Sequence, residues 1–162
     1  MRVADYVIKF LEGKKIDTVF TVSGGGSIFL CDALYKAKKL KYIPCHHEQA
    51  VSFATESYSR IKNKPGAAIV TTGPGGTNCT TGVACCWIDS IPSLFISGQV
   101  FSNQTIGDTG TRQIGVQEFD IINMVKSSTK YSVMIKNPNE IKYHLEKAYY
   151  LSTQGRPGPV WI

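Results

Sequence analysis

The segment His46–Gln49 (HHEQ) carries the residue types best suited to acid–base chemistry. It follows a short apolar run at residues 42–45 and opens a polar-faced helical pattern over residues 50–62. Glu48 is therefore expected where a buried strand ends and a helix begins. Two interpretations stay open: an acid that merely suits the positive end of a helix dipole, and a buried general acid or base. His47 could act as a local acid or base beside it, although a plain loop histidine is the default.

Strands and helices alternate along the chain, which is typical of an α/β fold. Apolar runs rich in β-branched and aromatic residues predict strands at residues 18–22, 41–45, 67–72, 94–97, 131–135 and 159–162. Apolar residues at helical spacing predict helices at residues 2–12, 28–38, 50–62, 119–125 and 139–153, and another that follows Asn78 and runs to about Asp89. Pro65-Gly66 predicts a turn. Because the strands are near-continuous apolar runs, we expect a mostly parallel sheet with helices on both faces, in a three-layer, doubly wound arrangement.

Four unusual loops are expected at one edge of that sheet. Ligands of parallel sheets bind outside the carboxyl ends of the strands, and the loops that follow the first four strands contain residues 24–26, 46–48, 73–78 and 98–99. Glycine lets the backbone approach a ligand closely, so their convergence predicts a binding site. Each glycine loop taken singly is equally well explained as a tight turn. Residues 100–117 predict a long loop, of a kind that is often functional.

Neither glycine loop suits a nucleotide phosphate. Residues 24–29 have a phenylalanine where the dinucleotide fingerprint needs its third glycine, and residues 73–78 lack the Lys-Ser/Thr pair of a P-loop. Pro74 also removes a backbone donor that a phosphate would need. A flatter, less charged ligand fits better, with Glu48 and Asn78 as the polar contacts.

The composition indicates one ordinary domain of 162 residues, 43% hydrophobic, with a net charge of +6. Its lysine-rich patch at residues 36–41 has no interleaved aromatic platform, so no nucleic-acid partner is expected. The five cysteines are odd in number and lack CxxC spacing, which favours reduced core residues over a metal site. No run approaches membrane-spanning length and no leader opens the chain, so a cytoplasmic protein without a membrane partner is expected.

Several motifs occur in an order and spacing that closely resemble one known family. They are residues 45–50, 71–78, 89–92, 96–100, 117–118 and 155–160. Over essentially its whole length, the chain resembles the N-terminal pyrimidine-binding domain of thiamine-diphosphate-dependent enzymes, of the acetolactate synthase large, catalytic subunit type. Any one motif is modest support, whereas the ordered set is strong.

The resemblance implies a catalytic role for Glu48. Its carboxyl would hydrogen-bond N1′ of the aminopyrimidine of thiamine diphosphate and favour the tautomer that removes a proton from the thiazolium ring. By the same resemblance, Pro74 and Asn78 would line the pyrimidine as further cofactor-binding residues. Gln117 would approach the reacting end of the cofactor.

The resemblance also implies a substrate side, bordered by Gly25, Gly26 and Val116. Two departures from the family lie there. The family usually has a proline before its glycines, in the region of Ser23 and Gly24, and acetolactate synthases commonly have phenylalanine at the place of Val116. These departures leave cofactor use intact and leave the acceptor substrate open.

The implied reaction is the decarboxylating carboligation of a 2-keto acid, with two pyruvate molecules giving acetolactate and carbon dioxide, as in branched-chain amino acid biosynthesis. Mg²⁺ and the diphosphate would be bound by a C-terminal domain, and FAD is left open as a further cofactor. The active site would form at the subunit interface of a homodimer or homotetramer. Residues 1–162 are therefore expected to be one domain of a longer chain, inactive alone. A thiamine-diphosphate decarboxylase, a sugar-modifying homologue and a non-catalytic assembly module are the alternatives, with a flavodoxin-like nucleotide binder as a weaker one.

Overall fold

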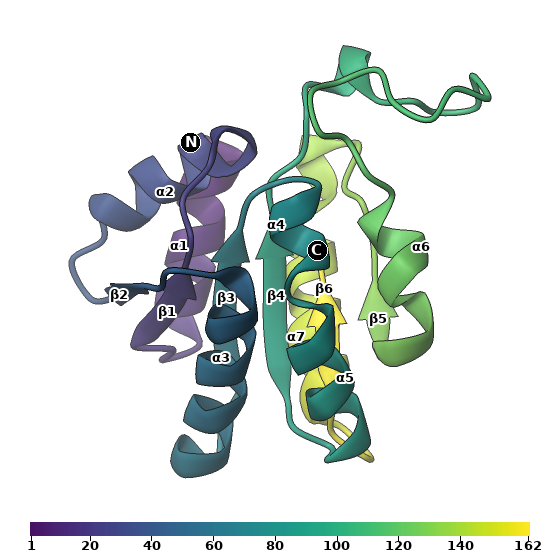
Figure 1. Ribbon diagram of the computed structural model, residues 1–162. Helices are drawn as coiled ribbons and strands as arrows, with labels where there is room; N and C mark the ends of the chain where they lie inside the picture. The colour runs from purple at the N-terminus through teal and green to yellow at the C-terminus, as the bar shows by residue number, and fades with distance from the viewer.

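A sheet of six parallel strands forms the centre of the computed structural model, which describes residues 1–162 (Figure 1). The strands are β1 (Thr18–Thr21), β2 (Lys41–Pro44), β3 (Gly66–Val70), β4 (Ser93–Ser97), β5 (Tyr131–Ser132) and β6 (Pro159–Trp161). Their order is β2-β1-β3-β4-β6-β5, and every neighbouring pair is parallel. The order reverses between β1 and β3, and a crevice for ligands is expected beyond the carboxyl ends of these strands.

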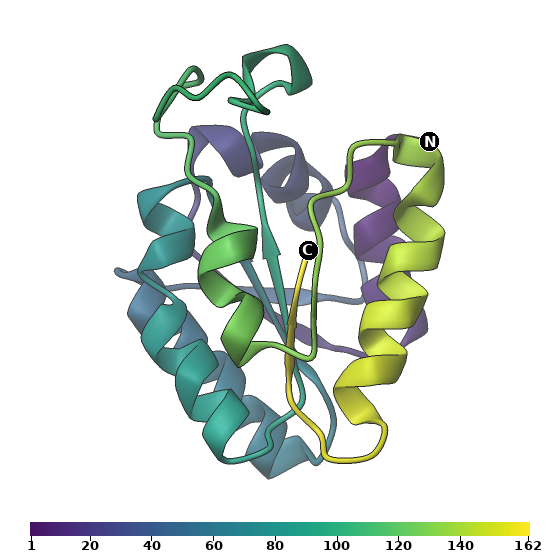
Figure 2. The same ribbon diagram turned by 90° about the vertical axis from the view of Figure 1, so that its right-hand side faces the viewer.

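Helices cover both faces of the sheet, as Figure 2 shows, so the three-layer α/β prediction is confirmed. They are α1 (Val3–Gly13), α2 (Ile28–Tyr35), α3 (Glu48–Lys62), α4 (Pro74–Thr77), α5 (Thr80–Ile88), α6 (Ile121–Val125) and α7 (Ile141–Thr153). Short 3-10 turns occupy Gly25–Ser27, Ser102–Gln104, Lys126–Ser128 and Pro138–Glu140. No helix combines the length and the apolar character that crossing a membrane would require.

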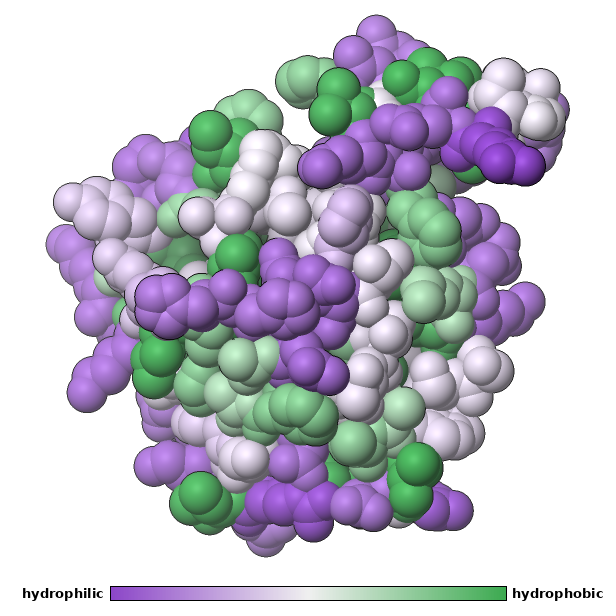
Figure 3. Space-filling view, in the orientation of Figure 1, coloured by the Kyte–Doolittle hydropathy of each residue, from purple (hydrophilic) through white to green (hydrophobic).

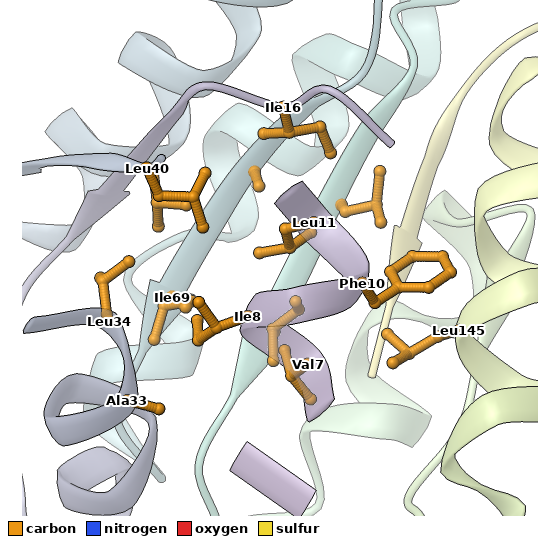
Figure 4. Close-up of a cluster of buried hydrophobic side chains, with 14 of the residues drawn as sticks. Val7, Ile8, Phe10, Leu11, Ile16, Ala33, Leu34, Leu40, Ile69 and Leu145 are labelled. Carbon is orange, nitrogen blue, oxygen red and sulfur yellow. The ribbon is translucent and has the colours of Figure 1, made fainter. Parts of the chain in front are cut away.

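Two apolar clusters hold the layers together, one on each face of the sheet. Alternation along β3 divides the strand between them: Ala67 and Ile69 belong to a cluster of 18 buried residues, Ala68 and Val70 to one of 12. The larger cluster joins the sheet to α1, α2 and α7 (Figure 4), and the smaller joins it to α3, α5 and α6. The strands of the interior are therefore buried on both faces, as their apolar runs predict.

The prediction of a buried strand before Glu48 is wrong. All four residues of β2 are exposed, including Tyr42 and Ile43 at 46% and 44%. The reason is the strand order, because β2 lies at the edge of the sheet and pairs on one side only, with β1. Its apolar run therefore marks an exposed surface and not a part of the core.

Two further boundaries differ from the sequence prediction. Gly66 is not a turn residue but the first residue of β3, where its N–H donates to Ser59 Oγ at 2.8 Å. A Cβ there would lie 2.6 Å from the Thr55 carbonyl oxygen, so the glycine allows close contact between α3 and the strand. The strand predicted over residues 131–135 ends at Ser132, because the neighbouring β6 ends at Trp161.

Candidate functional site

Only three charged side chains are buried in the whole chain, and all three are glutamates: Glu48, Glu56 and Glu118. Buried carboxylates need partners, because removing a charge from water is costly. Glu56 is paired with the guanidinium of Arg60, and Glu118 accepts hydrogen bonds from backbone N–H groups. Glu48 accepts a single side-chain hydrogen bond and forms no ion pair. It is thus the buried acid with the fewest internal partners.

Glu48 is the first residue of α3, two residues earlier than the sequence pattern indicates. The helix begins there because His47 is its N-cap: the backbone of His47 is extended (φ −157°, ψ 145°) and its Nδ1 accepts from the Gln49 N–H at 3.1 Å. His47 thus has a structural role at the start of the helix. The carboxylate of Glu48 lies at the positive end of the helix dipole, as the simpler interpretation requires.

The two oxygens of the Glu48 carboxylate have different surroundings. Oε2 accepts from Asn78 Nδ2 at 2.9 Å, and the thiol of Cys79 donates to the backbone oxygen of Glu48 at 3.3 Å. Oε1 accepts no hydrogen bond within the chain. It is not sealed in the interior either, because the one enclosed polar side-chain atom without a partner is Thr21 Oγ1. Oε1 is therefore available to a ligand that carries a donor.

The segment that follows β3 forms the wall beside this oxygen. Gly73 has a positive φ of 57°, and Pro74 then begins the one-turn helix α4, which the sequence prediction treats as a loop. A Cβ on Gly75 would lie 2.6 Å from Thr71 Cγ2 and 3.3 Å from Glu48 Oε1. Gly75 thus keeps the space beside Oε1 clear. Sequence reasoning missed its role, although its place in the Gly-Pro-Gly-Gly run was a usable signal.

The other glycine loops meet this segment directly, as their positions after the strands predict. The Gly26 N–H donates to Thr71 Oγ1 at 3.1 Å, and a Cβ on Gly26 would lie 2.9 Å from Thr72. A Cβ on Gly98 would lie 2.0 Å from the Gly26 carbonyl oxygen. The loops after β1, β3 and β4 therefore interlock at backbone contact distance. Gly25 does not take part, because nothing lies within 4 Å of its would-be Cβ.

The end of the long loop, at Gln117, also lies against the segment that follows β3. Gln117 has a positive φ of 58°, and its carbonyl oxygen lies so close to Gly73 that a Cβ there would be 1.9 Å away. The side chains of Pro74 and Gln117 are exposed, and Val116 is 79% exposed. The structure thus brings Glu48, Asn78 and the Gly73 segment together with the Gln117 backbone. Gly25 and Val116 lie at the surface and do not contact Glu48 or Asn78.

A cavity with a volume of about 590 Å³ and a mostly apolar lining is a separate feature. It lies between the end of β4, the helices α1 and α7, and the long loop, and its lining includes Ile96, Ile106, Glu118 and Ile141. Neither Glu48 nor Asn78 borders it. The open carboxylate oxygen of Glu48 therefore lies outside this cavity.

The five cysteines are all free thiols, and two of them, Cys79 and Cys86, are buried, whereas the other three are partly exposed and so are not core residues as predicted. Burial, together with the nearby Glu48 carboxylate, raises the pKa of Cys79 well above its ordinary value. Burial also raises the pKa of Cys86 to about 12. Because only the thiolate is a good nucleophile, these two cysteines serve as small packing residues beside α3.

Residues 1–124 match the family described as thiamine pyrophosphate enzyme, N-terminal TPP binding domain. The chain is 36% identical over 162 residues to the chloroplastic acetolactate synthase of Arabidopsis thaliana, covering 98% of this chain and 23% of that protein. It is 35% identical over 159 residues to the acetolactate synthase large subunit of Haemophilus influenzae, covering 98% and 27%. It is 34% identical over 154 residues to the mitochondrial catalytic subunit of acetolactate synthase from Saccharomyces cerevisiae, covering 95% and 22%. The chain thus spans about a quarter of the length of these relatives. It belongs to the thiamine pyrophosphate enzyme family, as an N-terminal TPP binding domain.

Proposed function

We propose that this chain binds the aminopyrimidine end of thiamine diphosphate and supplies the acid–base residue, Glu48, of an enzyme that acts on 2-keto acids. The observation that carries the proposal is a buried carboxylate with one oxygen held by Asn78 and the other open to a ligand. A carboxylate whose only role was structural would be expected to satisfy both oxygens, as Glu118 does through backbone N–H groups and Glu56 does through Arg60 and the Ser57 hydroxyl.

The residues around Glu48 fit a flat heteroaromatic ring. The open oxygen can share a proton with a ring nitrogen, and the absent side chain of Gly75 leaves room beside it. The exposed ring of Pro74 offers an apolar surface at the start of α4. Asn78 would act through Glu48, because its amide donates to Oε2 and so fixes the orientation of the carboxyl.

When bound, thiamine diphosphate supplies the electron sink that the decarboxylation of a 2-keto acid requires. Within this chain, Glu48 would hold and move a proton at Oε1. The low exposure of Glu48, at 9%, strengthens that hydrogen bond by keeping competing water away from the carboxyl. The Gly73 contact would keep the Gln117 backbone near the same ligand.

We assign the substrate as a 2-keto acid and the reaction as acetolactate synthesis from pyruvate, on the strength of the relatives' names. Mg²⁺ and the diphosphate are assigned to a domain outside residues 1–162, in keeping with the greater length of those relatives, and this chain would be one domain of such an enzyme. FAD stays a prediction. Exposed apolar side chains, among them Phe29, Trp87 and Ile88, support assembly as a homodimer or homotetramer.

A second candidate keeps the cofactor and changes the acceptor. Val116 stands at the exposed end of the long loop, where acetolactate synthases commonly carry phenylalanine, and Ser23 and Gly24 replace the usual proline region. A decarboxylase or a sugar-modifying enzyme would bind the cofactor through the same Glu48 carboxylate and would differ in the residues that border the substrate. The cytoplasmic location also stays a prediction, because some relatives are named as chloroplastic or mitochondrial.

The test is acetolactate formation from pyruvate by the full-length protein, with thiamine diphosphate and Mg²⁺, alongside a titration of cofactor binding. Acetolactate together with saturable cofactor binding supports the first candidate. Cofactor binding without acetolactate turns the search to other keto acids and to sugar acceptors. If neither product nor cofactor binding is found, the proposal is wrong and a non-catalytic module of the same fold replaces it.

A further inference from the structure

We propose that Glu118 is a positioning residue: it anchors residues 100–117 and thereby holds Gln117 against the Gly73 segment. The inference rests on the proposed function for one point only, namely that Gln117 lies on the cofactor side of the site.

Most of the loop that Glu118 would anchor is exposed. Figure 1 shows it projecting between β4 and α6, and Figure 3 shows its mostly hydrophilic surface standing clear at the upper right. Between residues 107 and 117 only Gly115 is buried. A segment this exposed would be expected to sample many conformations unless specific contacts restrain it.

The carboxylate of Glu118 supplies such contacts at two places in the loop. Oε1 accepts from the Ile106 N–H at 2.6 Å, while Oε2 accepts from the N–H groups of Ile114 and Gly115 at 3.3 and 3.4 Å. Glu118 is 8% exposed and forms no ion pair, so backbone donors alone compensate its charge. Hydrogen bonds to an ionised acceptor are the stronger kind, and one side chain thus closes the loop upon itself.

The anchor is connected to Gln117 through the backbone. The Glu118 N–H donates to the Gly115 carbonyl at 3.1 Å, which places Gln117 inside a tight turn with φ of 58°. A positive φ is unfavourable for a residue other than glycine and persists where neighbouring contacts determine it. Here the Glu118 hydrogen bonds restrain the turn from one side, and the contact with Gly73 restrains it from the other.

The first test measures the loop itself in the full-length protein carrying Glu118→Gln. The substitution keeps the size of the side chain but turns an amide NH₂ toward a backbone N–H, so the hydrogen bonds to one of the two carboxylate oxygens must be lost. We expect amide exchange over residues 105–116 to become about tenfold faster. Trypsin offers a second readout, because Arg112 is the only lysine or arginine between residues 65 and 125. Its cleavage should accelerate in parallel.

Two matched variants make this test specific. Glu140→Gln removes the charge of an exposed acid outside the loop, and it should leave both readouts unchanged. Glu118→Asp retains the charge with a shorter side chain, so it should be intermediate, and it serves as the test variant if Glu118→Gln does not fold. Unchanged exchange in a folded Glu118 variant would overturn the proposal, whatever its activity.

The second test asks whether Glu118 acts through Gln117. We compare kcat at saturating cofactor and substrate for Gln117→Ala, Glu118→Gln and the double variant. Each single change should lower kcat about tenfold, and the double variant should be no worse than either, because both remove the same positioned group. The dissociation constant of thiamine diphosphate should stay within about twofold, since the Glu48 and Asn78 contact is untouched.

The outcomes separate this inference from the proposed function. Additive losses in kcat would show that Glu118 supports the loop without positioning Gln117, and would overturn the inference. A wild-type protein that neither binds thiamine diphosphate nor turns over a 2-keto acid would count against the proposed function. The exchange and trypsin measurements would then decide alone whether Glu118 is the anchor.

Discussion

Two buried glutamates on the same helix, α3, have opposite surroundings. Glu48 begins the helix at the carboxyl end of the sheet, and Glu56 lies further along, toward the amino end. Their exposures are almost equal, at 9% and 8%. Glu56 is neutralised by Arg60, which also contacts Asp89, whereas Glu48 has a single neutral donor, the amide of Asn78.

The difference shows that burial alone does not mark a functional acid. At the amino end of the sheet the polar groups satisfy one another: the Tyr58 hydroxyl donates to Asp17, and Lys64 bonds the same carboxylate. At the carboxyl end the polar groups leave one acceptor of Glu48 open. The candidate site is identified by a buried acid, Glu48, whose carboxylate has one oxygen without a hydrogen-bond partner in the chain. This acid lies at the place where the strand order reverses.

The most direct test of this difference is to neutralise each glutamate in turn. Glu48→Gln removes the proton-transferring group, so turnover of a 2-keto acid by the full-length protein should fall by about a hundredfold or more. Glu56→Gln should leave turnover within about twofold and lower the free energy of unfolding by about 1 kcal/mol, because it weakens the charge-assisted bond to Arg60. Steady-state rates and urea unfolding of both variants measure the two effects.

The stability measurement also serves as the control for Glu48→Gln. The glutamine keeps a carbonyl oxygen for the Asn78 amide, so this variant should unfold near the wild-type midpoint. If turnover survives Glu48→Gln, the assignment of acid–base chemistry to this residue is wrong. Equal losses of turnover in both variants would mean that the two ends of α3 do not differ in function.

The sequence predicts the carboxyl-end site better than the contacts that build it. The apolar runs and the loops after them predict a parallel sheet with a site at one edge, because side-chain alternation and strand direction follow local rules. The exposure of β2 could not be predicted, since it depends on strand order. The His47 cap and the anchoring by Glu118 depend on where loop backbones turn, and the spacing of residues does not encode this directly.

A glycine pair tests how rigid the carboxyl end is. A Cβ on Gly98 would lie 2.0 Å from the Gly26 carbonyl oxygen and 2.6 Å from the Ser27 nitrogen, and backbone atoms at this crossing cannot easily move away. Gly98→Ala should therefore lower the free energy of unfolding by about 3 kcal/mol. Gly25→Ala adds the same methyl group where nothing lies within 4 Å, and it should change stability by less than about 0.5 kcal/mol. Similar unfolding midpoints for the two variants would contradict the interlocking of these loops.

The N-cap of α3 gives a smaller effect at the same end. His47→Ala removes the acceptor for the Gln49 N–H and should cost about 1 kcal/mol in the free energy of unfolding. His47→Asn supplies another side-chain acceptor and should recover most of that loss. Urea unfolding at neutral pH measures both variants. Equal stability of the alanine and asparagine variants would show that the observed bond does not hold the start of the helix.

The smallest expected effect lies at the amino end and appears only as a pH dependence. The hydrogen bond from Tyr58 lowers the pKa of Asp17 to about 2, with further contributions from Thr18 and Lys64. Because this pKa is lower in the folded chain than in the unfolded one, the stabilisation is complete above about pH 4 and is lost as the pH falls toward 2. Asp17 is 53% exposed, so solvent screening limits the contribution to less than about 1 kcal/mol.

Tyr58→Phe isolates this contribution, because it keeps the ring that packs edge-on against Phe20 at 6.1 Å and removes only the hydroxyl donor. Asp17 in the variant should have a pKa closer to its ordinary value, so less of its stabilisation remains to be lost on acidification. The gap in unfolding free energy between wild type and variant should consequently be larger at pH 6 than at pH 2. An equal gap at the two pH values would mean that the hydroxyl contributes packing alone. The Asp17 carboxylate at the amino end would then not be stabilised by the Tyr58 hydroxyl, and it would no longer differ in this respect from the open carboxylate of Glu48.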